Sequence, residues 1–326
     1  MPHRKRGWGA DIRGQLAGLM LYDAYQAQSD LLAPLRAWAG LTSALYRDTY
    51  AGPRANYVFQ SIAAAAEILH RARLVHERPS FDITAIEMAG HVVPVHEEKI
   101  LDTPFATLLR FRKETVGVQP RVLIVAPMAG HFPTLLRQTV ITMLADHDVF
   151  ITDWKNARDV PLKDGRFGLD EYIDHTIRFF ETLGPGAHVV AVCQPCAALL
   201  AAVAVMAQTY HPCQPRSMTL MAGPIDTRVN PTAVNDLATG HPIDWFERFL
   251  IASVPGRYAG ANRRVYPGFL QFSAFMSMNL PRHLRAHLDL FAEVVRGEDA
   301  KAQAKREFYD EYFSVFDLPA EFYLET

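Results

Sequence analysis

The sequence is poor in cysteine and nearly balanced in charge. Only 3 of its 326 residues are cysteine, too few for a disulfide framework in a chain of this size. This favours a reducing compartment, in which single thiols can do chemistry. Lysine and arginine together number 33 and the acidic residues 35, so the charge does not indicate nucleic acid or an anionic membrane surface. We therefore expect no nucleic-acid partner.

Long apolar runs are also missing. Behind the basic cluster His3 to Arg6, the apolar stretch Leu16 to Tyr22 stops at Asp23, which does not fit a signal peptide. No apolar run is long enough to cross a bilayer, and no internal repeat occurs. The 49% share of hydrophobic residues is ordinary for a soluble globular protein. We expect a cytoplasmic protein without a membrane span.

Hydrophobic periodicity divides the chain into three parts. Residues 1–19 show no clear period, and we interpret them as a flexible arm. Residues 20–226 begin with helical spacing and continue through strand-like segments into alternating strands and helices. Residues 227–326 are aromatic-rich and helical in pattern, with breaks at prolines. We expect N-terminal helices and an α/β core, followed by a helical cap region that ends without closing strands.

The middle part of the chain predicts a wound α/β sheet. Short apolar runs that suit buried strands are separated by segments with helical spacing, and they lie at 121–126, 149–152, 189–192 and 217–222. Strands that alternate with helices pair in parallel through right-handed crossovers. The expected fold class is therefore α/β with a mostly parallel sheet, and the cap is inserted after a late strand.

Cys193 lies where the strand Val189 to Val192 meets the following helix. Pro195 suits the first turn of a helix, where its missing N–H costs nothing. A nucleophile elbow places its nucleophile at such a hinge, and the helix N-terminus adds positive potential. Ala191 and Pro195 replace the two glycines of G-x-S-x-G, but alanine is small and proline already has a helical φ. A buried structural cysteine is the alternative; the position favours a nucleophile.

The elbow sequence also allows two other interpretations. C-x-P-C is typical of thiol–disulfide oxidoreductases, but here several strands and helices precede the motif and a large helical region follows it. The other interpretation is a zinc site, whose ligands would be Cys193, Cys196, His211 and Cys213. Its spacing is loosely plausible, yet the turn-rich surroundings of a zinc knuckle are missing. We rank both below the nucleophile and expect neither a metal nor a cofactor.

The loop Pro127 to Phe132 follows a strand expected to lie beside the elbow strand. Acyl transfer needs two N–H donors aimed at the developing oxyanion. We expect one from the backbone of Gln194 and the other from Met128 or Ala129. Gly130 allows the backbone to approach closely. The alternative is a plain turn between a strand and a helix.

Further candidates each have a structural alternative. His131 would contact substrate or cap its loop. Trp154 follows the carboxyl end of a strand, where α/β sheets bind ligands, and would line an acyl pocket or pack in the core. Asp226 would be a triad acid or form an Asx turn. No histidine after the elbow ends a sheet strand, so the base is not evident; these histidines are His211, His241, His283 and His287.

Four stretches together resemble the intracellular polyhydroxyalkanoate (poly-3-hydroxybutyrate) depolymerases. They are residues 125–132, 151–158, 190–195 and 268–272, and Cys-Gln-Pro at the elbow is the most telling. The resemblance implies an α/β-hydrolase that cleaves polyester bonds with Cys193 and needs no cofactor. Its partners would be polymer granules or hydroxyacyl oligomers. It also implies a triad aspartate and histidine beyond residue 326, as in a family member cut off before its last strands.

The same resemblance leaves two rivals open. The polyhydroxyalkanoate synthases use a similar cysteine, so an acyltransferase acting on a hydroxyacyl thioester is one alternative. A chain that lacks closing strands and a base could instead bind granules without cleaving them. Ester cleavage that depends on Cys193 separates the hydrolase from the binding protein, and transfer from a coenzyme A thioester identifies the acyltransferase.

Overall fold

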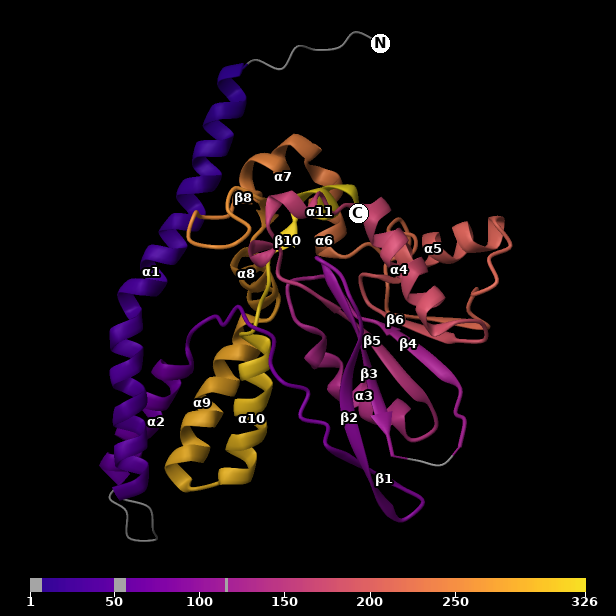
Figure 1. Cartoon of the computed structure of the whole chain (residues 1–326). Coiled ribbons are helices and arrows are strands. Elements are labelled where there is room, and N and C mark those ends of the chain that lie inside the picture. The colour runs from indigo at the N-terminus through magenta and orange to yellow at the C-terminus, as the bar shows by residue number, and fades with distance from the viewer. Residues whose placement is uncertain (1–7, 50–56, 115–116) are drawn as a thin grey trace.

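The computed structural model describes the backbone of residues 8–49, 57–114 and 117–326. Its centre is a seven-stranded sheet (Figure 1) with the order β1-β2-β3-β5-β4-β6-β7. The strands of this sheet are β1 (Ala85–Met88), β2 (His91–Asp102), β3 (Ala106–Lys113), β4 (Arg121–Val125), β5 (Asp148–Trp154), β6 (His188–Val192) and β7 (Ser217–Met221).

Helices precede, separate and follow these strands. The α-helices are α1 (Trp8–Thr49), α2 (Tyr57–Arg71), α3 (Arg137–Leu144), α4 (Leu169–Leu183), α5 (Cys196–Gln208), α6 (Ala233–Gly240), α7 (Ile243–Phe249), α8 (Gly268–Met278), α9 (Leu280–Arg296), α10 (Asp299–Tyr312) and α11 (Ala320–Glu325). Short 3₁₀ helices are η1 (Pro133–Leu136), η2 (Ala157–Asp159) and η3 (Leu162–Asp164).

The sheet has an antiparallel half and a parallel half. β1, β2 and β3 pair antiparallel, and β3 joins β5 in the same sense. β5, β4, β6 and β7 run parallel, which confirms the expected α/β class. The chain passes from β4 to β5 on one side and returns to β6 on the other side of β4. This reversal is a topological switch point, and α/β sheets bind ligands at the carboxyl ends of the strands there.

Alternation along β4 assigns its side chains to two cores. Leu123 and Val125 belong to the core that also contains residues of α4 and α5. Val122 and Ile124 belong to a second core, on the side of α3. Successive side chains of a strand point to opposite faces, so an unbroken apolar run is buried only where helices cover both faces. Burial of both faces fixes the register of β4 against β6, the strand that leads into the Cys193 turn.

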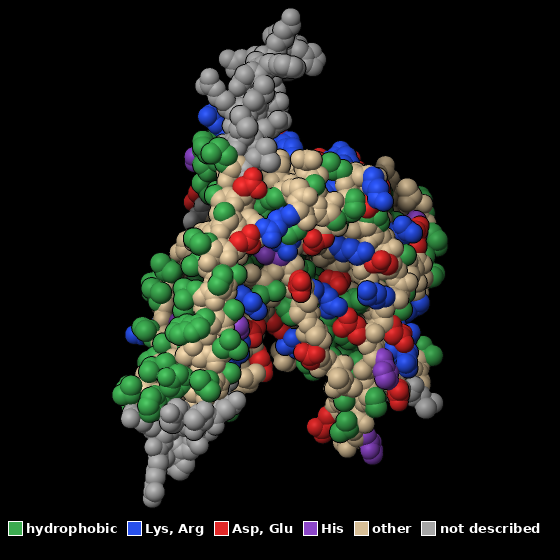
Figure 2. Space-filling view, turned by 60° about the vertical axis from the view of Figure 1, so that its left-hand side comes forward, with side chains coloured by type: hydrophobic (Ala, Val, Ile, Leu, Met, Phe, Trp, Pro, Cys, Tyr) green, Lys and Arg blue, Asp and Glu red, His purple; other side chains and the backbone are tan. Residues whose placement is uncertain are grey.

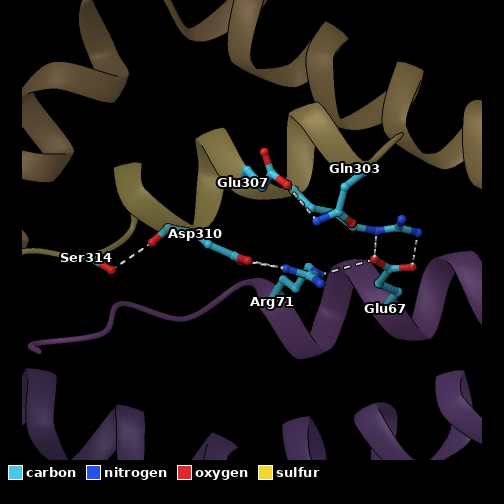
Figure 3. Close-up of polar contacts among 7 residues, drawn as sticks. Glu67, Arg71, Gln303, Glu307, Asp310 and Ser314 are labelled. Carbon is cyan, nitrogen blue, oxygen red and sulfur yellow. Dashed lines mark hydrogen bonds and ion pairs between the residues drawn. The ribbon is translucent and has the colours of Figure 1, made fainter. Parts of the chain in front are cut away.

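α1 and α2 form a layer beside the sheet together with α9 and α10 (Figure 1). Glu67 of α2 and Arg306 of α10 form a buried ion pair, and Arg71 joins Asp310 nearer the surface (Figure 3). α1 begins at Trp8, so most of the segment interpreted as a flexible arm is helical. That segment contains no proline after its second residue, so nothing in it stops the helix; residues 1–7 lie outside the described residues.

The C-terminal part is mainly helical, as expected, and it also contains a small sheet that the sequence did not predict. This antiparallel sheet has the order β10-β9-β8, with β8 (Ala252–Ser253), β9 (Arg264–Tyr266) and β10 (Leu318–Pro319). Its last segment returns to the main core, where Phe316 and Phe322 are buried. The Phe316 N–H donates to the Gly130 carbonyl over 2.9 Å. The cap region therefore packs on the core and holds the loop after β4. Among the described residues, no helix combines the length and apolar character that crossing a membrane requires.

Candidate active site

Cys193 has the backbone geometry of a nucleophile elbow. Its φ is +68°, a left-handed value that is uncommon for a residue with a side chain and marks the sharp turn of an elbow. The Cys193 N–H donates to the Met221 carbonyl over 2.8 Å, and its own carbonyl accepts from the Cys196 N–H over 3.3 Å. The two bonds fix the turn between β6 and α5 while the thiol remains exposed. The hinge position predicted for Cys193 is confirmed.

Gly223 allows the chain to pass close to the Cys193 turn, at which Ala191 and Pro195 replace the usual glycines. A Cβ at this position would lie 2.2 Å from Cys196 Cβ and 2.6 Å from the Cys193 carbonyl oxygen. The segment after β7 can therefore pass against the turn only because residue 223 lacks a side chain. Sequence reasoning placed this glycine at a strand end without assigning it a role. A glycine at the end of a strand is nevertheless a signal of close backbone approach.

Cys196 is a buried thiol at the first residue of α5. Its Sγ lies 3.6 Å from the Ala191 carbonyl and 3.7 Å from the Met221 carbonyl, and burial raises the pKa of the thiol. All three cysteines are free. Buried structural thiols of this kind are inert, so the geometry argues against the oxidoreductase interpretation.

The residues of the zinc interpretation do not converge on one point. Within the described ranges, no group of three or more histidine, cysteine, aspartate or glutamate side chains could hold a metal ion. His211 instead contacts Glu181 over 3.1 Å and accepts from the Cys213 N–H over 3.2 Å. These contacts tie the end of α5 to α4.

The loop after β4 meets the elbow through the side chain of Gln194. The Met128 N–H donates to Gln194 Oε1 over 3.2 Å, a contact that the sequence did not predict. In the part of the chain that the structure describes, the N–H groups of Gln194 and Ala129 have no hydrogen-bond partner. Gly130 has a φ of +85° and a Cβ there would lie 2.9 Å from Gln271 Oε1. Of the two candidate donors in the loop, the Ala129 N–H is therefore available to an oxyanion. The Met128 N–H becomes available only when the Gln194 side chain moves away.

His131 and Trp154 are both held by the fold. His131 stacks on Tyr312 with ring centroids 4.9 Å apart, its Nε2 lies 3.0 Å from the Tyr312 carbonyl, and burial lowers its pKa to about 4. Trp154 is fully buried, stacks on Tyr172 and donates from Nε1 to the Ala126 carbonyl over 2.9 Å. These contacts support the structural alternative for each residue: loop capping by His131 and core packing by Trp154.

Asp226 is exposed and forms an Asx-type turn. Its carboxylate accepts from the backbone N–H of Arg228 over 3.1 Å and pairs with both ends of that guanidinium over 2.8 Å. These hydrogen bonds lower the pKa of Asp226. No described histidine contacts it, so the structure does not assemble a triad around Asp226. The later histidines are engaged elsewhere: His241 with Trp245, and His283 and His287 with aromatic residues of α10.

The sequence of the cap region is similar to a known family. Residues 222–326 match the family model described as the PHB de-polymerase C-terminus. The match spans about the last third of the chain. The matched segment includes residues 268–272, one of the four stretches that carry the resemblance described above. In the structure this stretch opens α8, whose Gln271 lies against Gly130.

The solved structures that match this chain are distant from it. One is a thioesterase domain from the curacin biosynthetic pathway, with 16% identity, a TM-score of 0.30, and coverage of 48% of this chain and 53% of that one. Another is a fungal esterase from Rhizomucor miehei, with 13% identity, a TM-score of 0.34, and coverage of 60% and 61%. The chain thus spans about half to three fifths of the length of these proteins. No curated protein gives a significant match.

Proposed function

We propose that this protein is a carboxylic ester hydrolase that cleaves poly(3-hydroxybutyrate) through a thioester on Cys193. The observation that carries the proposal is the exposed Cys193 at φ +68°, on a strand–turn–helix at the switch point of the sheet. The family match of residues 222–326 and the α/β fold support a hydrolase. The polymer substrate and the cysteine chemistry are our inference.

The proposed reaction has two steps. The Cys193 sulfur attacks the ester carbonyl carbon, its proton passes to a base, and the carbonyl oxygen becomes an oxyanion. The N–H groups of Gln194 and Ala129 would stabilise that charge. The intermediate then expels the alcohol end of the polymer, which takes up a proton, and leaves a thioester on Cys193. Water hydrolyses the thioester, which releases a carboxylic acid and restores the thiol.

The group that accepts the Cys193 proton in the first step has to be located by experiment. Asp226 is paired with Arg228, and the described histidines after the elbow bond to other groups. We therefore compare two proteins in the same assay: the 326-residue chain, and the chain extended by a C-terminal segment of a family member. Activity that appears only on extension assigns the base to that segment.

Hydrolysis of amorphous poly(3-hydroxybutyrate) granules tests the proposed function. We expect release of hydroxyacids by the active form, complete loss in Cys193→Ala, and retention in Cys213→Ala, which removes a thiol outside the elbow. Transfer from a hydroxyacyl coenzyme A thioester without polymer cleavage would instead identify an acyltransferase. Granule binding by both the parent and Cys193→Ala, with no cleavage even after C-terminal extension, would contradict the hydrolase.

The proposed partner, a granule surface, fits an apolar face on α1 and α2. We define this face by its exposed hydrophobic side chains, which are Leu31, Leu35, Trp38, Leu41, Leu45, Tyr57, Val58, Ile62 and Leu69. It appears as a broad hydrophobic area in Figure 2. The only charged residues from 31 to 46 and from 57 to 69 are Arg36, which is half-buried, and Glu67, which is buried. A surface without charge suits a neutral polyester better than an anionic membrane, which attracts basic helices.

A further inference from the structure

A pocket of about 390 Å³ lies where α1, α8 and α9 meet, and it is built from none of the elbow residues. Its apolar wall consists of Leu74, Phe272, Met276, Leu284 and Phe313. The volume is within the range of small-molecule sites, which are mostly apolar with a few polar groups that fix orientation. The proposed ester hydrolysis does not use this pocket.

The charged groups of the pocket are all basic. Arg36 and Arg73 line it, and no aspartate or glutamate does. Within the described ranges, neither guanidinium forms an ion pair with a carboxylate. Asp30 on α1 is held by Arg257, and Asp310 on α10 is held by Arg71. Two arginines without acidic partners at an apolar wall are a site for an anion, because arginine binds carboxylates through paired hydrogen bonds.

Two histidines of α9 add to the polar lining, which also includes Tyr25, Gln28 and Ser29 of α1. His283 and His287 are one turn apart on the side of α9 that faces the pocket. Desolvation, followed by the nearby charges of His287 and Arg282, lowers the pKa of His283, so its ring is mostly neutral near pH 7. It adds hydrogen-bonding capacity rather than charge, and the positive charge is concentrated at the two arginines.

The walls of the pocket are held in place before any ligand arrives. Arg73 and Leu74 directly follow α2, and Phe313 directly follows α10. The ion pairs in Figure 3 join these two helices next to the pocket. A preorganised site loses less entropy on binding than a flexible one.

We propose that this pocket binds a small amphiphile with one carboxylate, whose head group pairs with Arg36 and Arg73 and whose apolar body packs against α8 and α9. A neutral apolar ligand would leave two guanidinium groups without partners, and a small inorganic anion would leave the apolar wall uncovered. Two sources share the required chemistry. One is a fatty acid; the other is a carboxyl-ended hydroxyacyl oligomer, an assignment that rests on the proposed function.

Calorimetric titration of the full chain tests the site. The probes are decanoate, the linear tetramer of 3-hydroxybutyrate with a free carboxylate, and methyl decanoate. We expect saturable binding of at least one of the two carboxylates and at least tenfold weaker binding of the methyl ester. Arg36→Met and Arg73→Met should each weaken carboxylate binding at least tenfold. Arg178→Met, an exposed arginine of α4 outside the pocket, should leave it unchanged.

Several results would overturn the proposal. One is that methyl decanoate binds as tightly as decanoate. Another is that Arg36→Met and Arg73→Met bind the carboxylates as tightly as the control Arg178→Met. The third is that neither carboxylate shows saturable binding. Arg36→Lys keeps the charge but not the paired hydrogen bonds of arginine, so its affinity should lie between those of the parent and Arg36→Met; such graded binding excludes misfolding as the cause of a loss. Titration of Cys193→Ala keeps the two proposals apart, because the pocket should bind as before when hydrolysis is abolished. A tighter tetramer identifies polyester fragments as the ligand class, and tighter decanoate identifies fatty acids; both support the site.

Discussion

At the residue scale, Cys193 combines an exposed thiol with a backbone angle that its own side chain disfavours. A left-handed φ costs a residue with a Cβ about 1 kcal/mol relative to glycine, and such strain persists where the surrounding fold enforces it. Here the enforcement comes from the hydrogen bonds to Met221 and Cys196. This strained turn leaves the Cys193 thiol exposed, as the proposed nucleophilic role requires.

Glycine at position 193 should therefore stabilise the protein while removing its reactive thiol. We expect the free energy of unfolding of Cys193→Gly to exceed that of Cys193→Ala by about 1 kcal/mol, measured by urea denaturation. Ala191→Gly, in the extended strand before the elbow, is the control and should destabilise, because glycine there costs chain entropy. Equal stabilities of the Gly and Ala variants at position 193 would show that the turn is not strained.

His131 should make the stability of the loop after β4 depend on pH. Burial lowers its pKa to about 4, whereas the unfolded chain has the ordinary value of about 6.5. The unfolded state therefore gains a proton first as pH falls. The contribution of neutral His131 to the free energy of unfolding is therefore complete above pH 6.5. It is lost as pH falls toward 4, by up to about 3 kcal/mol.

Denaturation of the parent and His131→Gln at pH 7.0, 5.5 and 4.5 measures this dependence. We expect a shallower loss of stability in the variant. The pKa of His76 is also lowered, to about 3, by burial, but His76 contributes equally to both proteins, so their difference isolates His131. Parallel curves would mean that His131 is protonated as easily in the fold as outside it.

At the scale of elements, the sequence predicted the parts whose pattern is local. α4 (Leu169–Leu183) lies in one of the helically spaced segments expected between the strands. The elbow was predictable because an apolar run, a cysteine and a helix-starting proline are adjacent. The contact of Met128 with the Gln194 side chain was not, because it joins residues 66 positions apart. The strands β8, β9 and β10 are too short to show a period of two.

The sequence also does not predict the contact between α2 and α10. Glu67 and Arg306 are 239 positions apart and both are buried. Removing one partner of a buried pair leaves a charge without compensation, which costs about 3–5 kcal/mol. An exposed pair contributes about 0–1 kcal/mol. The two ion pairs that join α2 to α10 in Figure 3 therefore differ in their contribution to stability, although Arg71 also contacts Glu67 over 3.1 Å.

Substitution of Glu67 tests this difference. We expect Glu67→Ala to lower the free energy of unfolding by about 3 kcal/mol, because Arg306 remains buried. Asp310→Ala removes the exposed partner of Arg71 and should cost less than about 1 kcal/mol. The double variant Glu67→Met with Arg306→Leu should recover most of the loss. Similar effects of the two single substitutions would contradict the burial of the Glu67 pair.

At the scale of the whole molecule, the apolar face and the α/β core lie on different sides. α1 buries one side against the protein and leaves large apolar side chains on the other, with Leu31 79% and Leu41 73% exposed. A helix that is apolar all round is usually covered on all sides. Contiguous exposed apolar patches mark interaction sites. If this face is the granule contact proposed above, the elbow residues take no part in attachment.

Replacing Leu31 and Leu41 with glutamine should separate attachment from chemistry. Glutamine keeps the helix, and the buried side of α1 is untouched. Because burying a leucine contributes about 1.5–3 kcal/mol, loss of both should weaken co-sedimentation with granules at least tenfold. The rate of Cys193 alkylation should stay the same, which checks that the elbow is intact. Val205→Gln changes an exposed apolar residue of α5 outside the face and should bind granules like the parent. If the double variant instead binds granules normally but sediments as a smaller species, the face joins two copies of the chain rather than the chain and its polymer.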